Sequence, residues 1–511
     1  MADRGSIVFS NTAMWDHIAT AFARQIKNVH GVDTVMLTHK ALLPNRATFF
    51  DRTAFSEIID WRPLLRIRPP HEVASTEFLA EEARRIERSE GFSLLEAIRS
   101  DRHVGAGFLA GATAFTSSYA RGATFDQIVD LALRIHRAIV ELLDRVRPIA
   151  VLSMAGMVHT TMLVNAAEAR GIPVRFLGAP RRRNLFFWSD NRFAWPVGFD
   201  HKYRLALASA PSRISPHEAH EPADETQLHT AMAIRENRRR PGLSDLLGAI
   251  YGILRSNWRR IVGLQPDSDY GMYSIPSRLA TAVWTWRMRR FIATAEHVLP
   301  RLPNDMPTVF FPLSSEPEMS LLVEAQCCDN QLTPIDWLAK ALPAGWRLLI
   351  KEHPVMDMPR PRGFWEQVRR YPNVVVLATT ENADDVMRRA KAVAVISSTV
   401  GVQAAMRGKP AISFNPNYIG TVMPHVLVAT SYSATAEALR RVRDDDLPSP
   451  EERSRAVWAF RQALAQSEFP IDDAALKIGV PGKIDPDPAL ISTLADTFFR
   501  TLDSADRISA R

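Results

Sequence analysis

Cysteine is almost absent from this chain of 511 residues, and its only two cysteines, Cys327 and Cys328, are neighbours. Adjacent cysteines cannot build a disulfide framework, and they lack the spacing of a structural zinc site. We therefore expect both to be reduced and half buried. Since 46% of the residues are hydrophobic, a chain of this length can instead bury two ordinary cores.

Long hydrophobic runs are missing too. No stretch of about eighteen apolar residues occurs, and the start, Met1 to Arg4, lacks a signal-peptide pattern, which predicts a cytoplasmic protein. A Gly-x-Gly-x-x-Gly fingerprint is absent, and so are zinc-finger, RNA-binding and basic-zipper patterns. We expect neither a dinucleotide cofactor nor a nucleic-acid partner. The formal charge of +7 favours other anionic partners, namely lipid headgroups, nucleotides or phosphorylated acceptors.

Two polar motifs in the second half of the chain each follow an apolar run. Lys351-Glu352-His353-Pro354 comes after residues 346–350, and Ser397-Ser398-Thr399-Val400-Gly401 comes after residues 392–396. Both runs have the composition of buried parallel strands. Because ligands of open α/β sheets bind beyond the carboxyl ends of the strands, we expect both motifs to line one crevice.

The residue types of the two motifs suit an anionic ligand. A turn rich in Ser and Thr at the start of a helix offers backbone N–H groups and hydroxyls to a phosphate. The alternative is that Ser397 or Ser398 only caps the helix. Pro354 disfavours helix at His353, so the imidazole should point outward, where it can donate to a phosphate oxygen. A solvated surface histidine is the alternative for His353.

Together these motifs resemble the bacterial glycosyltransferases of capsule and surface-polysaccharide synthesis, a family that includes the Kdo transferases of capsule export. The resemblance covers residues 308–418 and also includes Phe311-Pro312-Leu313, Glu316-Pro317-Glu318, Asn330-Gln331, Leu342-Pro343, Pro372-Asn373-Val374 and Gly408-Lys409-Pro410. It implies an α/β fold of GT-B type, with two Rossmann-like domains facing a cleft. It also implies inverting transfer without an obligatory metal, from a CMP-activated sugar such as Kdo in preference to a UDP-sugar.

The resemblance assigns roles by position. The His-Pro motif of the family falls on His353 and Pro354, and its phosphate-binding hydroxyls fall on Ser397, Ser398 and Thr399. The other expected donor-binding residues are Glu316, Glu318, Lys351, Glu352, Gly401, Gln403 and Tyr418. Gln403 stands where many relatives have a glutamate for the ribose, and it can still hydrogen-bond a hydroxyl, though without charge. Tyr418 is expected to stack on a base or sugar.

The acceptor side is expected in the first half of the chain. An inverting transferase needs a carboxylate to take the proton of the acceptor hydroxyl, and Asp101, where a helix gives way to a Gly-rich bend, is the candidate. A structural cap is its alternative. The further candidates are His159 and the run Arg181-Arg182-Arg183. The alternative for His159 is a capping or core position, and the alternative for the arginine run is an exposed basic loop.

The expected domains are an acceptor-side domain (1–210), a helical insertion (211–303), a nucleotide-sugar domain (304–485) and a last helix that crosses back (486–511). Within the insertion, residues 250–264 combine Ile, Leu and Trp with Arg255, Arg259 and Arg260. Such a helix either lies in a membrane interface, which suits a lipid-linked acceptor, or packs on the interdomain hinge.

The sequence thus predicts a cytoplasmic glycosyltransferase, with the inner face of the membrane as a further expected location. It needs no cofactor besides the nucleotide-sugar donor, and its acceptor is a glycan or glycolipid. Two alternatives stay open. One is a nucleotide-sugar epimerase of the same double fold, and the other is a transferase-like scaffold without activity, suggested by Gln403.

Overall fold

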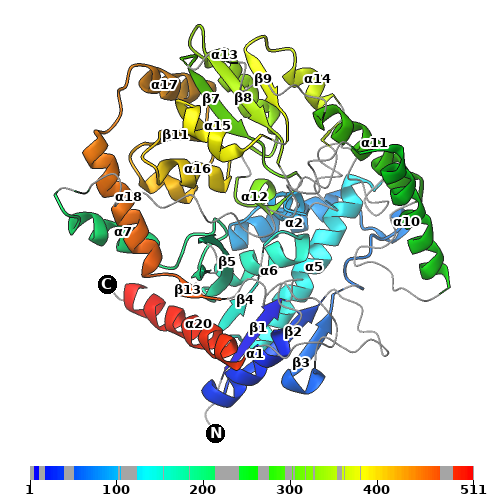
Figure 1. The fold of residues 1–511 in the computed structure, drawn as a ribbon. Helices are drawn as coiled ribbons and strands as arrows, with labels where there is room; N and C mark the ends of the chain where they lie inside the picture. Colours follow the sequence, from blue (N-terminus) through cyan, green and yellow to red (C-terminus); the bar gives the residue numbers. More distant parts are fainter. Residues whose placement is uncertain are drawn as a thin grey trace.

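The computed structural model of the chain contains two β-sheets, each covered by helices on both faces (Figure 1). It describes residues 5–10, 18–38, 51–61, 63–101, 104, 123–153, 155–182, 185–212, 214, 241–262, 275–293, 302, 305–316, 318–325, 328–353, 360–361, 363–379, 381–471 and 487–509. The predicted class, α/β with two Rossmann-like domains and a helical insertion, is confirmed.

The first domain is built on a seven-stranded sheet in the order β13-β6-β5-β4-β1-β2-β3. Its strands are β1 (Ser6–Ser10), β2 (Asp33–Thr38), β3 (Glu57–Asp60), β4 (Ala150–Leu152), β5 (Val174–Arg182), β6 (Leu185–Ser189) and β13 (Phe469–Pro470). The strands β1 to β5 are parallel, whereas β6 runs antiparallel to both β5 and β13.

Helices α1 (Ala19–Gln25), α2 (Thr76–Glu90), α3 (Leu94–Arg99), α5 (Phe125–Val146) and α6 (Val158–Ala169) belong to this domain, with a π-helical turn (Ile26–His30) and two 3-10 turns (Arg52–Ala54, Pro70–Glu72). Helix α5 begins at a capping box between Thr124 and Gln127, and it ends at Arg147 in the left-handed conformation. These local signals explain why its bounds follow the sequence pattern.

The second domain contains a fully parallel six-stranded sheet in the order β12-β11-β10-β7-β8-β9. Its strands are β7 (Thr308–Pro312), β8 (Arg347–Lys351), β9 (Val374–Leu377), β10 (Ala392–Val395), β11 (Ala411–Ser413) and β12 (Val426–Val428). Its helices are α12 (Met319–Leu322), α13 (Leu332–Ala341), α14 (Phe364–Val368), α15 (Ala383–Arg389), α16 (Thr399–Ala405), α17 (Tyr432–Arg443) and α18 (Pro450–Ala465), with a 3-10 turn (Ile419–Val422).

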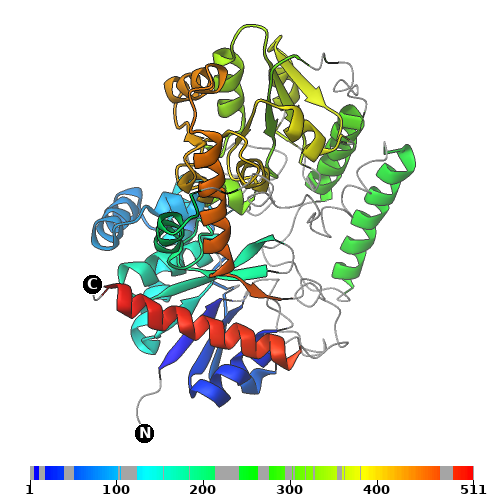
Figure 2. The same cartoon turned by 60° about the vertical axis from the view of Figure 1, so that its left-hand side comes forward.

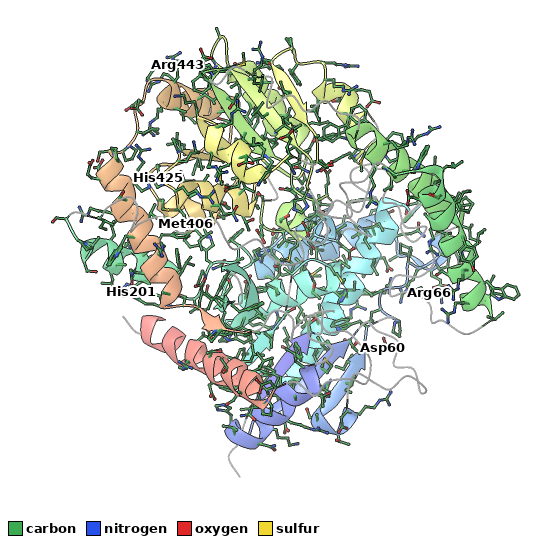
Figure 3. The ribbon with its side chains drawn as sticks, in the orientation of Figure 1. Asp60, Arg66, His201, Met406, His425 and Arg443 are labelled. Carbon is green, nitrogen blue, oxygen red and sulfur yellow. The ribbon has the colours of Figure 1, made fainter. Side chains whose placement is uncertain are left out.

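The chain crosses between the domains twice. Helix α7 (Phe199–Ala208), marked by His201 in Figure 3, joins the core of the second domain, where the ring of Phe199 lies 5.2 Å from that of Phe460. The return is made by β13 and α20 (Pro488–Ser509), and α20 lies along the first sheet (Figure 2). The ranges expected for the domains, 1–210 and 304–485, therefore each include a segment that packs on the other domain.

The predicted insertion contributes α10 (Leu243–Ile261) and α11 (Ile275–Ala293). Helix α11 is attached to the second domain, because Met288 is part of its core and Trp284 Nε1 donates to the carbonyl of Arg360 over 3.0 Å. No helix within the described ranges is long and apolar enough to cross a membrane.

Candidate functional site

The carboxyl ends of three neighbouring strands meet at one edge of the second sheet. The central strand β7 pairs in parallel with β8 and with β10, so that Pro312 lies opposite Lys351 and Phe310 opposite Val393. His353 and the turn of residues 397–401 therefore leave the sheet at the same edge, while the crevice that both were expected to line stays a prediction. The loop that follows β7 lies between them in strand order.

A buried arginine organises two of these strand ends. Arg360, which is 1% exposed, donates to Glu352 through Nε (3.0 Å) and Nη2 (2.5 Å), and to Glu316 through Nη1 (2.8 Å). Its Nη2 also donates to the carbonyl of Ser314 over 2.7 Å, and Gln331 Nε2 donates to Glu316 over 3.0 Å. We call these five residues the Arg360 network. It ties the loop after β7 to the loop after β8.

The Arg360 network occupies the carboxylates of two of the glutamates that were expected to contact the nucleotide sugar. Glu316 and Glu352 were expected to bind the nucleotide sugar, and the structure shows both occupied by Arg360. Burial raises the pKa of Glu316, while the Arg360 guanidinium and the Gln331 amide oppose that rise. Their donor-binding role stays a prediction, and their contacts are those of a support beneath the site.

Of the other residues around β8, His353 is half buried and its backbone N–H donates to Glu352 Oε1 over 2.7 Å, which fixes the corner predicted from the His-Pro motif. The side chain of Lys351 is buried, and Glu318 is exposed at the start of α12. Pro354 lies outside the described residues.

Two residues that follow β11, Asn415 and Tyr418, hydrogen-bond to the turn after β10. Ser398 Oγ accepts the backbone N–H of Val400 and so caps α16, while Ser397 Oγ accepts from Asn415 Nδ2 over 3.3 Å. The hydroxyl of Tyr418 donates to the carbonyl of Ser398 over 2.6 Å. Ser398 is therefore a helix cap, as the alternative expected, and the phosphate-binding role of the turn stays a prediction.

Packing explains the glycine of this turn. A Cβ on Gly401 would lie 2.5 Å from Val395 Cγ2 and 2.7 Å from the hydroxyl of Tyr418. Tyr418 is only 3% exposed, so its ring clamps the turn, and stacking on a base stays a prediction. Thr399 and Gln403 are exposed on α16, where they are accessible to a ligand.

On the acceptor side, Asp101 is fully buried and its two carboxylate oxygens accept the backbone N–H groups of Val104 (3.2 Å) and Val158 (3.0 Å). Since Val158 begins α6, these contacts are those of a helix cap, and its role as a base stays a prediction. His159 is buried, with its ring 5.7 Å from that of Trp61.

The arginine run predicted beside these residues is described only in part. Arg181 and Arg182 end β5, but their side chains lie outside the described part of the chain, as does the whole of Arg183.

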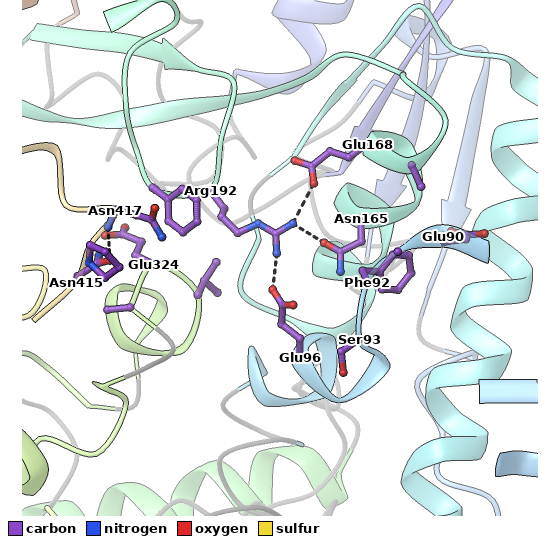
Figure 4. Close-up of a pocket in the computed structure, with 16 residues that line it drawn as sticks. Glu90, Phe92, Ser93, Glu96, Asn165, Glu168, Arg192, Glu324, Asn415 and Asn417 are labelled. Carbon is purple, nitrogen blue, oxygen red and sulfur yellow. Dashed lines mark hydrogen bonds and ion pairs between the residues drawn. The ribbon is translucent and has the colours of Figure 1, made fainter. Parts of the chain in front are cut away.

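A cavity of about 560 Å³ lies between the domains (Figure 4). Its polar lining consists of Glu90, Ser93, Glu96, Asn165, Glu168 and Arg192 from the first domain and Glu324, Asn415 and Asn417 from the second. Because Asn415 also donates to Ser397, the cavity adjoins the turn after β10. The indole N–H of Trp195 donates to the carbonyl of Asn417 over 2.7 Å and holds the two walls together.

Arg192 is the centre of the first-domain wall. It donates to Glu96 (2.8 Å), Glu168 (3.0 Å) and Asn165 Oδ1 (2.6 Å), as Figure 4 shows. This fixes the amide of Asn165 with its Nδ2 as a buried donor that has no acceptor among the described residues. Sequence reasoning missed Arg192. The usable signal was the apolar run of residues 185–188, which ends in polar residues as a strand does.

At the edge of the cavity, Glu90 accepts from Arg170 and lies 3.0 Å from Nε2 of His136. Burial lowers the pKa of His136, although the carboxylate of Glu90 opposes that shift. Within the described ranges, no three His, Cys, Asp or Glu side chains are grouped so that they would hold a metal ion.

Residues 280–419, which include both strand-end motifs, match the family model of the capsule polysaccharide biosynthesis proteins. The resemblance to capsule polysaccharide biosynthesis proteins is confirmed over this segment. No curated protein matches the sequence.

Several solved structures share features with the chain at low similarity. KpsC of Thermosulfurimonas dismutans, a beta Kdo 2,4 transferase, is 13% identical, with 61% of this chain and 79% of that chain covered and a TM-score of 0.30. HepE of Anabaena, in complex with UDP-glucose, is 12% identical over 97% and 100% of the chains, with a TM-score of 0.29. The UDP-GlcNAc 2-epimerase of Neisseria meningitidis is 12% identical over 90% and 99%, with a TM-score of 0.24. These values do not distinguish a transferase from an epimerase.

Proposed function

We propose that this chain is an inverting glycosyltransferase of capsular or surface-polysaccharide synthesis. One observation carries the proposal: the segment that matches the capsule family contains both His353 and the turn of residues 397–401, and the second sheet brings both to one edge. Two groups able to hold a phosphate thus converge inside the part of the chain that has the family resemblance.

The proposed donor is a CMP-activated sugar, Kdo or a related keto-sugar. The acceptor oxygen attacks the anomeric carbon, the bond from that carbon to the phosphate oxygen breaks, and the electron pair leaves with the nucleotide. His353, Ser397 and Thr399 stabilise the departing phosphate, while a first-domain carboxylate, proposed as Asp101, takes the acceptor proton. Fixed N–H, hydroxyl and imidazole donors can supply the charge stabilisation, so the proposal requires no metal.

The proposed acceptor is a glycan or a glycolipid, bound from the side of His159 and the arginine run of residues 181–183. On this proposal the protein works in the cytoplasm, at the inner face of the membrane that carries a lipid-linked acceptor.

The deciding experiment replaces His353 by alanine and compares sugar transfer with that of His71→Ala, a histidine whose side chain is 80% exposed. Because His353→Ala removes one hydrogen-bond donor that stabilises the leaving phosphate, its kcat should fall by a factor of about 10²–10³. The kcat of His71→Ala should equal that of the parent. A His353 variant within a few-fold of the parent enzyme would remove this residue from the mechanism. Thermal shifts with CMP, UDP, GDP and dTDP identify the nucleotide, because a ligand of the folded state raises its apparent stability.

Product analysis separates the alternatives. An epimerase converts a free UDP-sugar without any acceptor, whereas the transferase forms a new glycan only when an acceptor is present. A scaffold binds no nucleotide in the thermal-shift series and fails both assays.

A further inference from the structure

The outer face of α10 carries a continuous stripe of large apolar side chains that are exposed to solvent. Its members follow one another at helical spacing and are 50–74% exposed: Leu243, Leu247, Tyr251, Leu254, Trp258 and Ile261. We call them the α10 stripe. In Figure 2, α10 lies at the edge of the molecule, away from both sheets. A contiguous apolar patch of this kind on a soluble protein marks an interaction surface.

The stripe is not the face by which α10 is attached to the protein. Leu246, Ile250, Ile253 and Asn257 are less exposed and form the neighbouring face, which packs toward α11. Trp286 of α11 also donates from Nε1 to the carbonyl of Gly242, over 2.7 Å. One apolar face therefore holds the helix in place, and the stripe beside it is left for a partner.

The charges next to the stripe indicate which partner fits. Arg255 and Arg259 are exposed and lie beside the stripe, one and two helical turns after Tyr251. The single acidic residue of α10, Asp245, lies on the far side of the helix, where it accepts the N–H of Gly242 over 2.6 Å. The partner surface must therefore be apolar at its centre and anionic at its border.

A lipid bilayer with anionic headgroups has both properties. Tyr and Trp side chains favour the boundary between headgroups and acyl chains, and arginines can keep their guanidinium groups among the phosphates. A second copy of the chain fits less well, because the one carboxylate of α10, Asp245, lies away from the stripe and already accepts the N–H of Gly242.

We propose that α10 lies in the surface of an anionic membrane, with the α10 stripe in the acyl-chain boundary and the two arginines among the headgroups. The inference rests on the proposed function only for its purpose, which is to bring the enzyme to a lipid-linked acceptor. Membrane binding is measured without sugar transfer, so either proposal can fail alone.

The test is co-sedimentation of the full chain with vesicles of phosphatidylglycerol and phosphatidylcholine, and with vesicles of phosphatidylcholine alone. The parent protein should bind the anionic vesicles, and Leu254→Ser combined with Trp258→Ser should weaken that binding by about tenfold or more. The matched control is Leu205→Ser combined with Tyr432→Ser, which removes two exposed apolar side chains (59% and 48%) from α7 and α17. It should bind like the parent.

Charge provides the second arm. Arg255→Glu combined with Arg259→Glu should weaken binding to anionic vesicles, and added salt should weaken the binding of the parent. The proposal is overturned if the parent ignores anionic vesicles, or if the stripe and control variants bind alike. It is also overturned if light scattering shows a dimer that dissociates in the stripe variant while vesicle binding is absent, since α10 would then join two copies.

Discussion

Two arginines of this protein are each held by two glutamates, and they differ in what surrounds them. Arg360 is 1% exposed, and both of its carboxylates come from loops of the second domain. Arg192 has a side chain that is 15% exposed, and it stands in the wall of a cavity between the domains. The first arginine is a buried joint inside one domain, whereas the second faces space that a ligand can enter.

The difference determines what each arginine contributes. A fully desolvated ion pair is costly to break, because the remaining charge stays buried without a partner. A pair at a solvated cavity loses little when one member is removed, since water replaces the lost contact. We therefore interpret the Arg360 network as a rigid support beneath the carboxyl ends of β7 and β8. The contacts of Arg192 with Glu96 and Glu168, in contrast, can rearrange when a ligand enters the cavity.

The largest expected effect comes from removing the buried joint. Arg360→Met should lower the free energy of unfolding by about 3–5 kcal/mol, measured by chemical denaturation, because the carboxylates of Glu316 and of Glu352, whose side chain is 3% exposed, are left without their cation. Burial already raises the pKa of Glu316, and the loss of Arg360 removes a group that opposes that rise. Protonation relieves the buried charge, so the stability deficit should be small at acidic pH, where the carboxyl groups are protonated, and should grow as the pH rises toward neutrality.

Arg360→Lys is the control for this variant, because it keeps the charge and loses the forked geometry. It should fall between the parent and Arg360→Met. If Arg360→Met is as stable as the parent at neutral pH, the Arg360 network does not act as a rigid support.

The next effect tests how tightly the same edge is packed. Gly401→Ala should destabilise the protein by about 1–3 kcal/mol, since the new methyl group meets Val395 and the hydroxyl of Tyr418. Combining it with Tyr418→Phe removes one of the two clashes and should recover part of the loss in the same denaturation assay. If the double variant loses the sum of the two single effects, the two residues are not in contact.

The sequence predicted the parts of the site that are local in the chain. The strands before His353 and Ser397 are apolar runs that end in polar residues, and parallel pairing alone brings such ends to one edge. The order of the strands, with β7 between β8 and β10, was not needed for that inference. The bounds of helix α5 likewise coincide with local signals, a capping box at Thr124 and a left-handed residue at Arg147.

The parts that escaped prediction depend on long-range contacts. Nothing near Arg360 in the sequence distinguishes a buried arginine from the exposed arginines elsewhere, since its burial depends on Glu316, which follows a different strand, as well as on Glu352 in its own loop. The pairing of β13 with β6, and the packing of α7 on the second domain, join segments far apart in the chain. The exposure of the α10 stripe likewise depends on which face α11 covers, and periodicity alone does not reveal it.

The smallest expected effect is at the cavity wall and completes the comparison. Arg192→Ala should lower the free energy of unfolding by about 1 kcal/mol or less, because Glu96 and Glu168 are 31% and 41% exposed and can be hydrated in its absence. Arg85→Ala, which breaks an exposed pair with Glu82, is the matched control and should behave alike in the same denaturation assay. If Arg192→Ala instead lowers the free energy of unfolding as much as Arg360→Met does, the contacts of Arg192 are as rigid as the Arg360 network. The cavity could then not adjust to a ligand.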